Sequence, residues 1–210
     1  MSTASDASVA ISALGLEPPP ADPGVFPARL PGDLAVWFFI LAELLAFAVF
    51  FLSYAFARAR NVALFNESQL TLDLNSGAIN TVLLITSSWF VVLAIKAVKR
   101  DATAAGARWL VAAMLGGFGF LVVKVIEYAA KFDAGITMST NTFYMFYISL
   151  TFFHFMHVIL GLVILGVLLA KTLKGAYGSH EYHVLESGGA YWHMVDLLWI
   201  VLFPLVYVMR

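Results

Sequence analysis

The sequence predicts an all-α integral membrane protein, a bundle of five transmembrane helices. Of its 210 residues, 61% are hydrophobic and 12% are charged, whereas soluble domains carry roughly 25% charged residues. Five apolar runs are each long enough to cross a bilayer core, which is about 30 Å thick. The chain has no cysteine, which excludes disulfides and thiolate metal sites. A net charge of −1 gives no indication of nucleic-acid binding.

The first 30 residues are polar and proline-rich, as in LEPPPADPGVFPARLPGD. They contain no basic region followed by an apolar one, so they do not form a secretory signal. We interpret residues 1–30 as a cytoplasmic tail, flexible or laid over a partner, and residues 31–210 as the five-helix transmembrane domain.

The first span is predicted over residues 34–57, with Glu43 as its one charged residue near mid-depth. A lone carboxyl group in hydrocarbon is costly, so this side chain must be protonated or paired with another helix. Two roles remain open for Glu43: a structural carboxyl that is hydrogen-bonded in a helix interface, or a step in a proton relay.

The second and third spans, 78–97 and 109–130, are rich in small residues, which predict close helix packing and interhelical hydrogen bonds. These residues are Asn80, Thr81, Thr86, Ser87 and Ser88 in the second span, and Ala112, Ala113, Gly116, Gly117 and Gly119 in the third. The third span also carries Lys124 and Glu127, three residues apart on one helical face. We expect an ion pair between them, although Lys124 is long enough to snorkel toward the interface.

The fourth span, 143–170, is an apolar run of 28 residues interrupted only by His154 and His157. As a helix it would be roughly 42 Å long. The two histidines lie three residues apart near its middle, where polar side chains must face protein or water rather than lipid. The other helices are therefore expected to pack around this span.

The fifth span is predicted over 190–209, after a loop that contains His180, His183 and Glu186. His193 and Asp196 lie three residues apart on one face near its start, and Pro204 should kink its last turns. Seven basic residues lie on the N-terminal side of the predicted spans and four on the opposite side. The positive-inside rule then places the N-terminus in the cytoplasm and the C-terminus outside.

The polar groups are predicted at different depths, so they cannot all ligate one metal ion. A heme between two helices would need His154 or His157 together with His193, but their expected depths differ by two to three turns. A di-iron site needs more histidines and carboxylates at one level than are present. The groups could serve as helix tethers or as a proton relay.

Several stretches carry a resemblance to subunit III of the heme-copper oxidase superfamily. FFHFMHVILG and AYWHMVDLLWIVLF are similar to the paired family patterns HGLHVIxG and YWHFVDxxW. Supporting stretches are WFFILAELLAF around Glu43, LNSGAINTVLLITSS at the second span, and IEY at Glu127 and Tyr128. These five blocks occur in the family's order over about residues 31–210.

The resemblance implies a helical bundle without its own catalytic, cofactor or metal site. It would dock beside catalytic subunit I, which holds hemes and copper or iron, with a subunit II or cytochrome c subunit as a further partner. Family members bind phospholipids, protect the catalytic core during turnover and support proton uptake. The family's polar positions fall here on Glu43, Glu127, His154, His157, Glu186, His193 and Asp196, for which the resemblance implies structural, lipid-binding or proton-related roles.

Larger family members have seven spans, whereas the first two are missing here, so a lipid cleft between those two and the other five cannot exist in the same form. The opening LPGDLAVWFFILAELLAF most resembles a short branch associated with nitric oxide reductases. We therefore expect an accessory subunit in a bacterial inner membrane, whose partner reduces oxygen or nitric oxide. A heme b anchor that handles quinone and a proton-coupled carrier are the alternatives; a carrier would usually show internal repeats or broken helices.

Overall fold

The computed structural model describes residues 34–178 and 182–209. Its five long helices are each long and apolar enough to cross a membrane, so the predicted all-α fold with five spans is confirmed. The predicted proline-rich tail, residues 1–30, lies outside the described residues, as does His180. The long helices are α2 (Leu34–Arg60), α4 (Leu74–Val98), α5 (Thr103–Asp133), α6 (Thr142–Leu173) and α7 (His183–Phe203).

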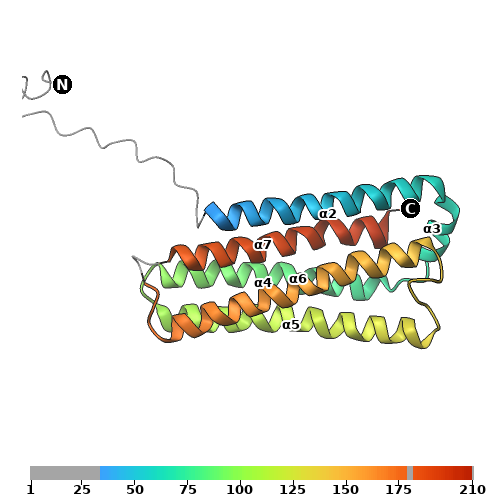
Figure 1. Ribbon diagram of the computed structural model, residues 1–210. Coiled ribbons are helices and arrows are strands. Elements are labelled where there is room, and N and C mark those ends of the chain that lie inside the picture. Colours follow the sequence, from blue (N-terminus) through green and yellow to red (C-terminus); the bar gives the residue numbers. More distant parts are fainter. Residues whose placement is uncertain (1–33, 179–181, 210) are drawn as a thin grey trace, which may run out of the picture. The chain divides into compact units, whose positions relative to one another are not determined.

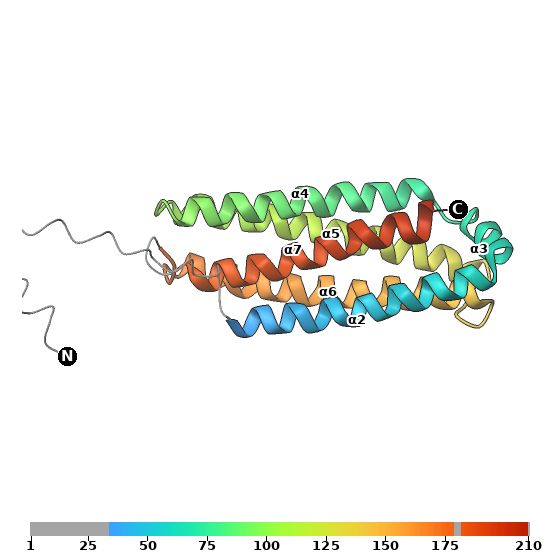
Figure 2. The same ribbon diagram turned by 90° about the horizontal axis from the view of Figure 1, so that it is seen from above.

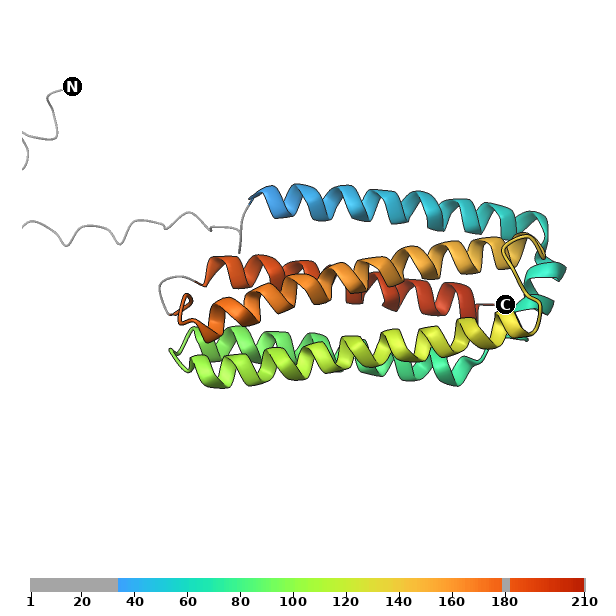
Figure 3. The ribbon, with the colours of Figure 1, turned by 60° about the horizontal axis from the view of Figure 1, so that its bottom comes forward.

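Helix α7, rather than the fourth span, lies at the centre of the bundle. It packs against α6, α4 and α2, and α5 packs against α4 and α6 on the side away from α2 (Figures 1 and 2). Figure 3 shows the same order from another side, with α2 on the outside of the bundle. Because α7 is surrounded on three sides, most of its residues are buried.

Helix α2 contacts the bundle along one narrow line. Its buried residues are Ile40, Phe47 and Tyr54, each seven positions after the last. A spacing of seven returns to the same face after two turns, so only one ridge of α2 faces protein. The rest of its apolar surface, including Leu45 and Leu52, is exposed as expected for a helix in lipid.

Three helices end with the same type of C-terminal backbone cap. Gly135 and Gly175 follow α5 and α6 with φ values of +74° and +70°, and Asp101 follows α4 with φ of +58°. In each case the next amide reaches back to the last turn, as in the 3.0 Å bond from Ile136 N to Lys131 O. This left-handed cap satisfies the last carbonyl groups and turns the chain back.

The structure differs from the sequence-based prediction at the start of α7. Residues 183–189 were predicted to be loop, but they form the first two turns of the helix. The glycines there serve close packing: a Cβ atom on Gly188 would lie 2.5 Å from Leu168, and one on Gly189 would lie 2.7 Å from Ile95. Glycine that lets helices approach has the same local signature as glycine in a loop.

Between the first two predicted spans, 34–57 and 78–97, the structure contains a short helix, α3 (Val62–Gln69). At the other end of the chain, Pro204 begins a π-helix, η1 (Pro204–Val208), instead of a simple kink. These two elements are joined because Gln69 donates a hydrogen bond of 2.9 Å to the carbonyl group of Val206. Arg58 also donates to the carbonyl group of Met209, so α2 and α3 hold the wider turns of η1 in place.

Candidate functional site

The site residues predicted from sequence do not form one centre. Instead the structure places them in three groups at different levels of the bundle: Glu43 with His157, Glu127 with Lys124, and Glu186 with the neighbourhood of His193. Among residues 34–178 and 182–209, no group of three or more histidines and carboxylates is arranged to hold a metal ion. Each group is therefore described separately.

Glu43 and His157 join α2 to α6 inside the membrane. The carboxylate atom Oε2 lies 2.9 Å from His157 Nε2. The other ring nitrogen, Nδ1, lies 2.7 Å from the carbonyl oxygen of Phe153. The rings of Phe47 and Phe153 pack against His157 at centroid distances of 5.3 and 4.6 Å. The pair is thus enclosed by aromatic rings, with the Glu43 side chain about one-fifth exposed.

These two hydrogen bonds restrict the protonation states of the pair. A carbonyl oxygen can only accept, so His157 Nδ1 carries a hydrogen atom. One further proton then lies between Nε2 and the carboxyl group: either an imidazolium ion faces a carboxylate, or a neutral imidazole accepts from a carboxylic acid. Both forms are neutral as a pair, which explains how a carboxyl group is accommodated at this depth.

His154 lies one turn away and is completely buried. Neither ring nitrogen has a hydrogen-bond partner among the described residues. The imidazole is packed between Trp199 and Phe120, with ring centroids 5.2 and 5.5 Å away. A neutral ring stacked among aromatic rings behaves mainly as a packing element.

A second group is buried between the C-terminal part of α5 and the N-terminal part of α6. Lys124 Nζ donates to Glu127 Oε2 at 3.1 Å and to the hydroxyl group of Tyr207 at 2.6 Å. Tyr147 and Tyr207 each donate to Glu127 Oε1 at 2.6 Å. The predicted Lys124–Glu127 ion pair is confirmed, and the lysine does not snorkel, since its side chain is fully buried.

This Lys124 cluster ties three helical elements together, because Tyr147 belongs to α6 and Tyr207 to η1. The ammonium group also lies 5.3 Å from the centroid of the Trp199 ring on α7. Sequence reasoning missed both tyrosines, since an aromatic residue near a span end is typical of the membrane interface. The signal that could have found them is the buried ion pair itself, which needs further hydrogen-bond partners.

The third group lies at the level where α7 enters the bundle. Ser88 Oγ on α4 is hydrogen-bonded to His193 Nδ1, and Ser88 also interacts with Asp196. Nearer the helix start, Glu186 forms an ion pair of 2.5 Å with Lys99 and lies 3.7 Å from His183. Ser88 was predicted only as a helix-packing residue, but here it also orients an imidazole.

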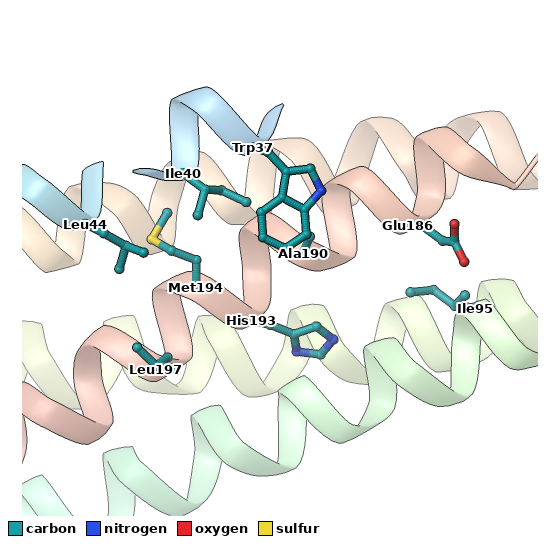
Figure 4. A pocket seen from close by; sticks show the side chains of 9 residues that line it. All are labelled: Trp37, Ile40, Leu44, Ile95, Glu186, Ala190, His193, Met194 and Leu197. Atoms are coloured by element: carbon teal, nitrogen blue, oxygen red, sulfur yellow. The ribbon is translucent and has the colours of Figure 1, made fainter. Parts of the chain in front are cut away.

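Two apolar grooves lie on opposite sides of the N-terminal half of α2. The first, the His193 groove, lies between α2 and α4 with α7 as its floor and has a volume of about 460 Å³. Figure 4 shows Trp37, Ile40 and Leu44 on one side of it and His193 projecting from α7 toward α4. The second, the Lys171 groove, lies between α2 and α6, has a volume of about 320 Å³, and ends at Lys171 and Tyr177.

The comparison with known families adds to this geometry. The family model for cytochrome c oxidase subunit III matches residues 32–210, which include every helix described above. This chain belongs to the cytochrome c oxidase subunit III family. The match confirms the resemblance drawn from the five sequence blocks, and together with the five apolar helices it makes the chain a multi-pass membrane protein.

Curated relatives agree with the assignment to the subunit III family. Cytochrome c oxidase subunit 3 of Thermostichus vulcanus is 33% identical over 84% of this chain and 86% of its own length. Quinol oxidase subunit 3 of Bacillus subtilis is 27% identical over 84% of the chain and 86% of its length. Heme-copper oxidase subunit I+III of Aeropyrum pernix is 32% identical over 87% of this chain, which spans 25% of that longer protein.

In this member of the subunit III family, two glycines that allow close helix packing contact the same tryptophan side chain. Trp192 on α7 lies between Gly117 of α5 and Gly161 of α6, where added Cβ atoms would lie 2.6 and 2.7 Å from its ring. The small residues predicted for helix approach therefore admit a tryptophan to the centre of the bundle.

Proposed function

We propose that this chain is the accessory, non-catalytic subunit III of a bacterial respiratory heme-copper complex, located in the inner membrane beside catalytic subunit I. The observation that supports this most is the family match over all five spans. The name of the Aeropyrum pernix relative supports the partner, since it joins subunits I and III in a single protein. The hemes and the copper or iron would belong to the partner.

The hydrogen bonds of the intramembrane polar groups support a stabilising role. Both ring nitrogens of His157 are engaged, and Glu127 accepts three hydrogen bonds. Heme ligation by His157 would require breaking one of its existing bonds. The interhelical bonds instead make a rigid bundle, which can hold a neighbouring subunit in one arrangement.

Phospholipid binding is proposed at the Lys171 groove. Val163 and Val167 of α6 and Phe39 of α2 give the groove apolar walls suited to an acyl chain. Lys171, near the end of α6, supplies a cation at the level of lipid headgroups. Tyr177 lies beyond the span with a buried hydroxyl group that has no partner among the described residues. Burial raises the pKa of Tyr177, so the hydroxyl group stays protonated and can donate to a phosphate oxygen.

Support of proton uptake is proposed for the Glu43–His157 pair. The pair holds one proton between two basic atoms 2.9 Å apart and lies beside a partly open helix, α2. The shared proton can pass from one group to the other without leaving a net charge in the hydrocarbon, as a step in a proton path would require. We also propose that the N-terminus is cytoplasmic, which follows from the distribution of basic residues.

The experiment is purification through a tag on this chain in mild detergent, followed by a visible spectrum and identification of the proteins that co-purify. Heme that arrives with a large catalytic subunit is the expected result. The identity of that subunit distinguishes an oxygen-reducing partner from a nitric oxide-reducing one. A heme spectrum from the chain alone would contradict the proposal and favour the heme b anchor instead.

A second measurement tests the stabilising role. Turnover of the complex with and without this chain should start at similar rates, and activity should decline faster when the chain is absent. The double variant Lys171→Ala/Tyr177→Phe should retain less phospholipid after purification, whereas Lys174→Ala, a nearby exposed lysine, is the matched control. Equal durability of the complex with and without this chain would contradict a protective role.

A further inference from the structure

In the part of the chain that the structure describes, the His193 groove contains a polar atom without a hydrogen-bond partner. Apart from Glu186, which is paired with Lys99, the rest of the lining is apolar, from Trp37, Ile40 and Leu44 on α2 to Met194 and Leu197 on α7. His193 Nδ1 is occupied by Ser88. Among the described residues, no hydrogen bond reaches the other ring nitrogen, Nε2, and the side chain is half-buried in the groove wall (Figure 4).

The depth of this nitrogen limits what can bind it. Helix α7 and η1 together run from His183 to Val208, 26 residues, or about 39 Å. His193 lies ten residues after His183, about 15 Å along the helix. If the span is centred on a hydrocarbon core of about 30 Å, His193 lies roughly 10 Å below the edge of that core. Phospholipid headgroups lie outside the core, so they do not reach this depth.

A ligand for this groove must therefore bring an oxygen atom into hydrocarbon on an otherwise apolar body. Isoprenoid quinones and quinols have this chemistry, with ring oxygens on a flat ring and a long apolar tail. The ring would lie against the indole of Trp37, and the tail would follow Leu44 and Leu197 along α2 and α7. Aromatic rings pack favourably in offset stacks of this kind.

We propose that the His193 groove binds an isoprenoid quinone or quinol, one ring oxygen of which is hydrogen-bonded to His193 Nε2. Ser88 allows both redox forms to bind, because its hydroxyl group can donate to Nδ1 or accept from it. In the first case Nε2–H donates to a quinone carbonyl group; in the second, Nε2 accepts from a quinol hydroxyl group. In the second case the hydroxyl group of Ser88 can donate its own hydrogen bond to the carboxylate of Asp196.

The Lys171 groove on the other side of α2 provides a contrast within the same molecule. Two further polar residues in its lining, Ser187 and Tyr191, donate to backbone carbonyl groups. The remaining polar groups, Lys171 and Tyr177, lie at the end of α6 and beyond it, at the level of phospholipid headgroups. The two grooves thus differ in the depth of the polar atoms that the described residues leave without a hydrogen-bond partner. That difference predicts a phospholipid in the Lys171 groove and a quinone in the His193 groove.

The test is a titration of the full-length chain, in nanodiscs of quinone-free phospholipid, with decylubiquinone. Quinones quench nearby tryptophan fluorescence, and Trp37 lines the groove. We expect saturable quenching that is lost in Trp37→Phe. His193→Leu should raise the Kd about tenfold, since one hydrogen bond is lost. His193→Gln should restore most of the affinity because an amide can donate and accept.

Two controls keep the outcome interpretable. Leu197→Phe adds bulk from a half-exposed position on the groove wall and should abolish saturable quenching while far-UV circular dichroism stays unchanged. His183→Leu, which replaces an exposed histidine outside the groove, should leave the Kd unchanged. Quenching that rises linearly and equally in the wild type and in Leu197→Phe would mean quinone dissolved only in the bilayer and would overturn the proposal. An unchanged Kd in His193→Leu would also overturn it.

Discussion

Replacement of Glu127 by glutamine tests the Lys124 cluster. The carboxyl group accepts three hydrogen bonds, at 2.6, 2.6 and 3.1 Å, and is paired with a fully buried ammonium group. In glutamine the amide oxygen can still accept from both tyrosines, so only the hydrogen bond with Lys124 is lost, which costs about 0.6 kcal/mol inside a membrane. Leaving a buried charge without its partner costs about 3–5 kcal/mol. Glu127→Gln should therefore lower the free energy of unfolding by about 3–5 kcal/mol.

The assay is reversible unfolding by SDS in mixed micelles, followed by far-UV circular dichroism. The double variant Lys124→Met/Glu127→Leu removes both charges. Its free energy of unfolding should be much closer to that of the wild type than the value for Glu127→Gln. The hydroxyl groups of Tyr147 and Tyr207 are near enough to hydrogen-bond each other in that variant. Glu67→Gln, an exposed glutamate on α3, is the control. A loss below 1 kcal/mol in Glu127→Gln, or a double variant less stable than that single variant, would refute the reasoning.

Three further predictions concern the other groups. Glu43→Gln should cost less than about 1 kcal/mol, since an amide can still bond His157, whereas Glu43→Lys should abolish folded protein on gel filtration. Gly117→Ala should lower the free energy of unfolding by about 1–3 kcal/mol, because its Cβ atom would lie 2.6 Å from Trp192. The hydrogen bond from Ser76 lowers the pKa of Asp73 from its ordinary 3.8. The stabilisation that Asp73 contributes is then complete above pH 3.8 and is lost as the pH falls through the lower folded-state pKa. In Asp73→Ala this part of the pH dependence should be absent from acid unfolding curves.

Each of these predictions has a control or an opposing outcome. Gly166→Ala is the packing control, since its nearest contact would be 3.7 Å from Met114. Equal tolerance of Glu43→Gln and Glu43→Lys would mean that the carboxyl group faces water rather than His157. Acid unfolding curves of the same shape with and without Asp73 would show that this helix cap does not contribute to the pH dependence.

The sequence was sufficient to predict the fold class because each span is a local property. A helix in hydrocarbon must be apolar over about 20 residues, and that requirement can be read without knowing its neighbours. The Lys124–Glu127 ion pair was predicted for the same reason, since residues three apart on a helix always share a face. The predicted span boundaries differ from the observed ones mainly where glycine packs against another helix, as at Gly188 and Gly189.

Only the tertiary structure decided which polar groups meet. Glu43 and His157 are 114 residues apart, and Glu127 and Tyr207 are 80 apart. Their pairing depends on the order in which helices surround α7 and on how far each helix is rotated about its axis. A hydrophobic pattern reports only that a face avoids lipid, not which helix it meets. The sequence by itself therefore determined five membrane-spanning helices and their inward polar residues, while the packing around α7 determined the partners of those residues.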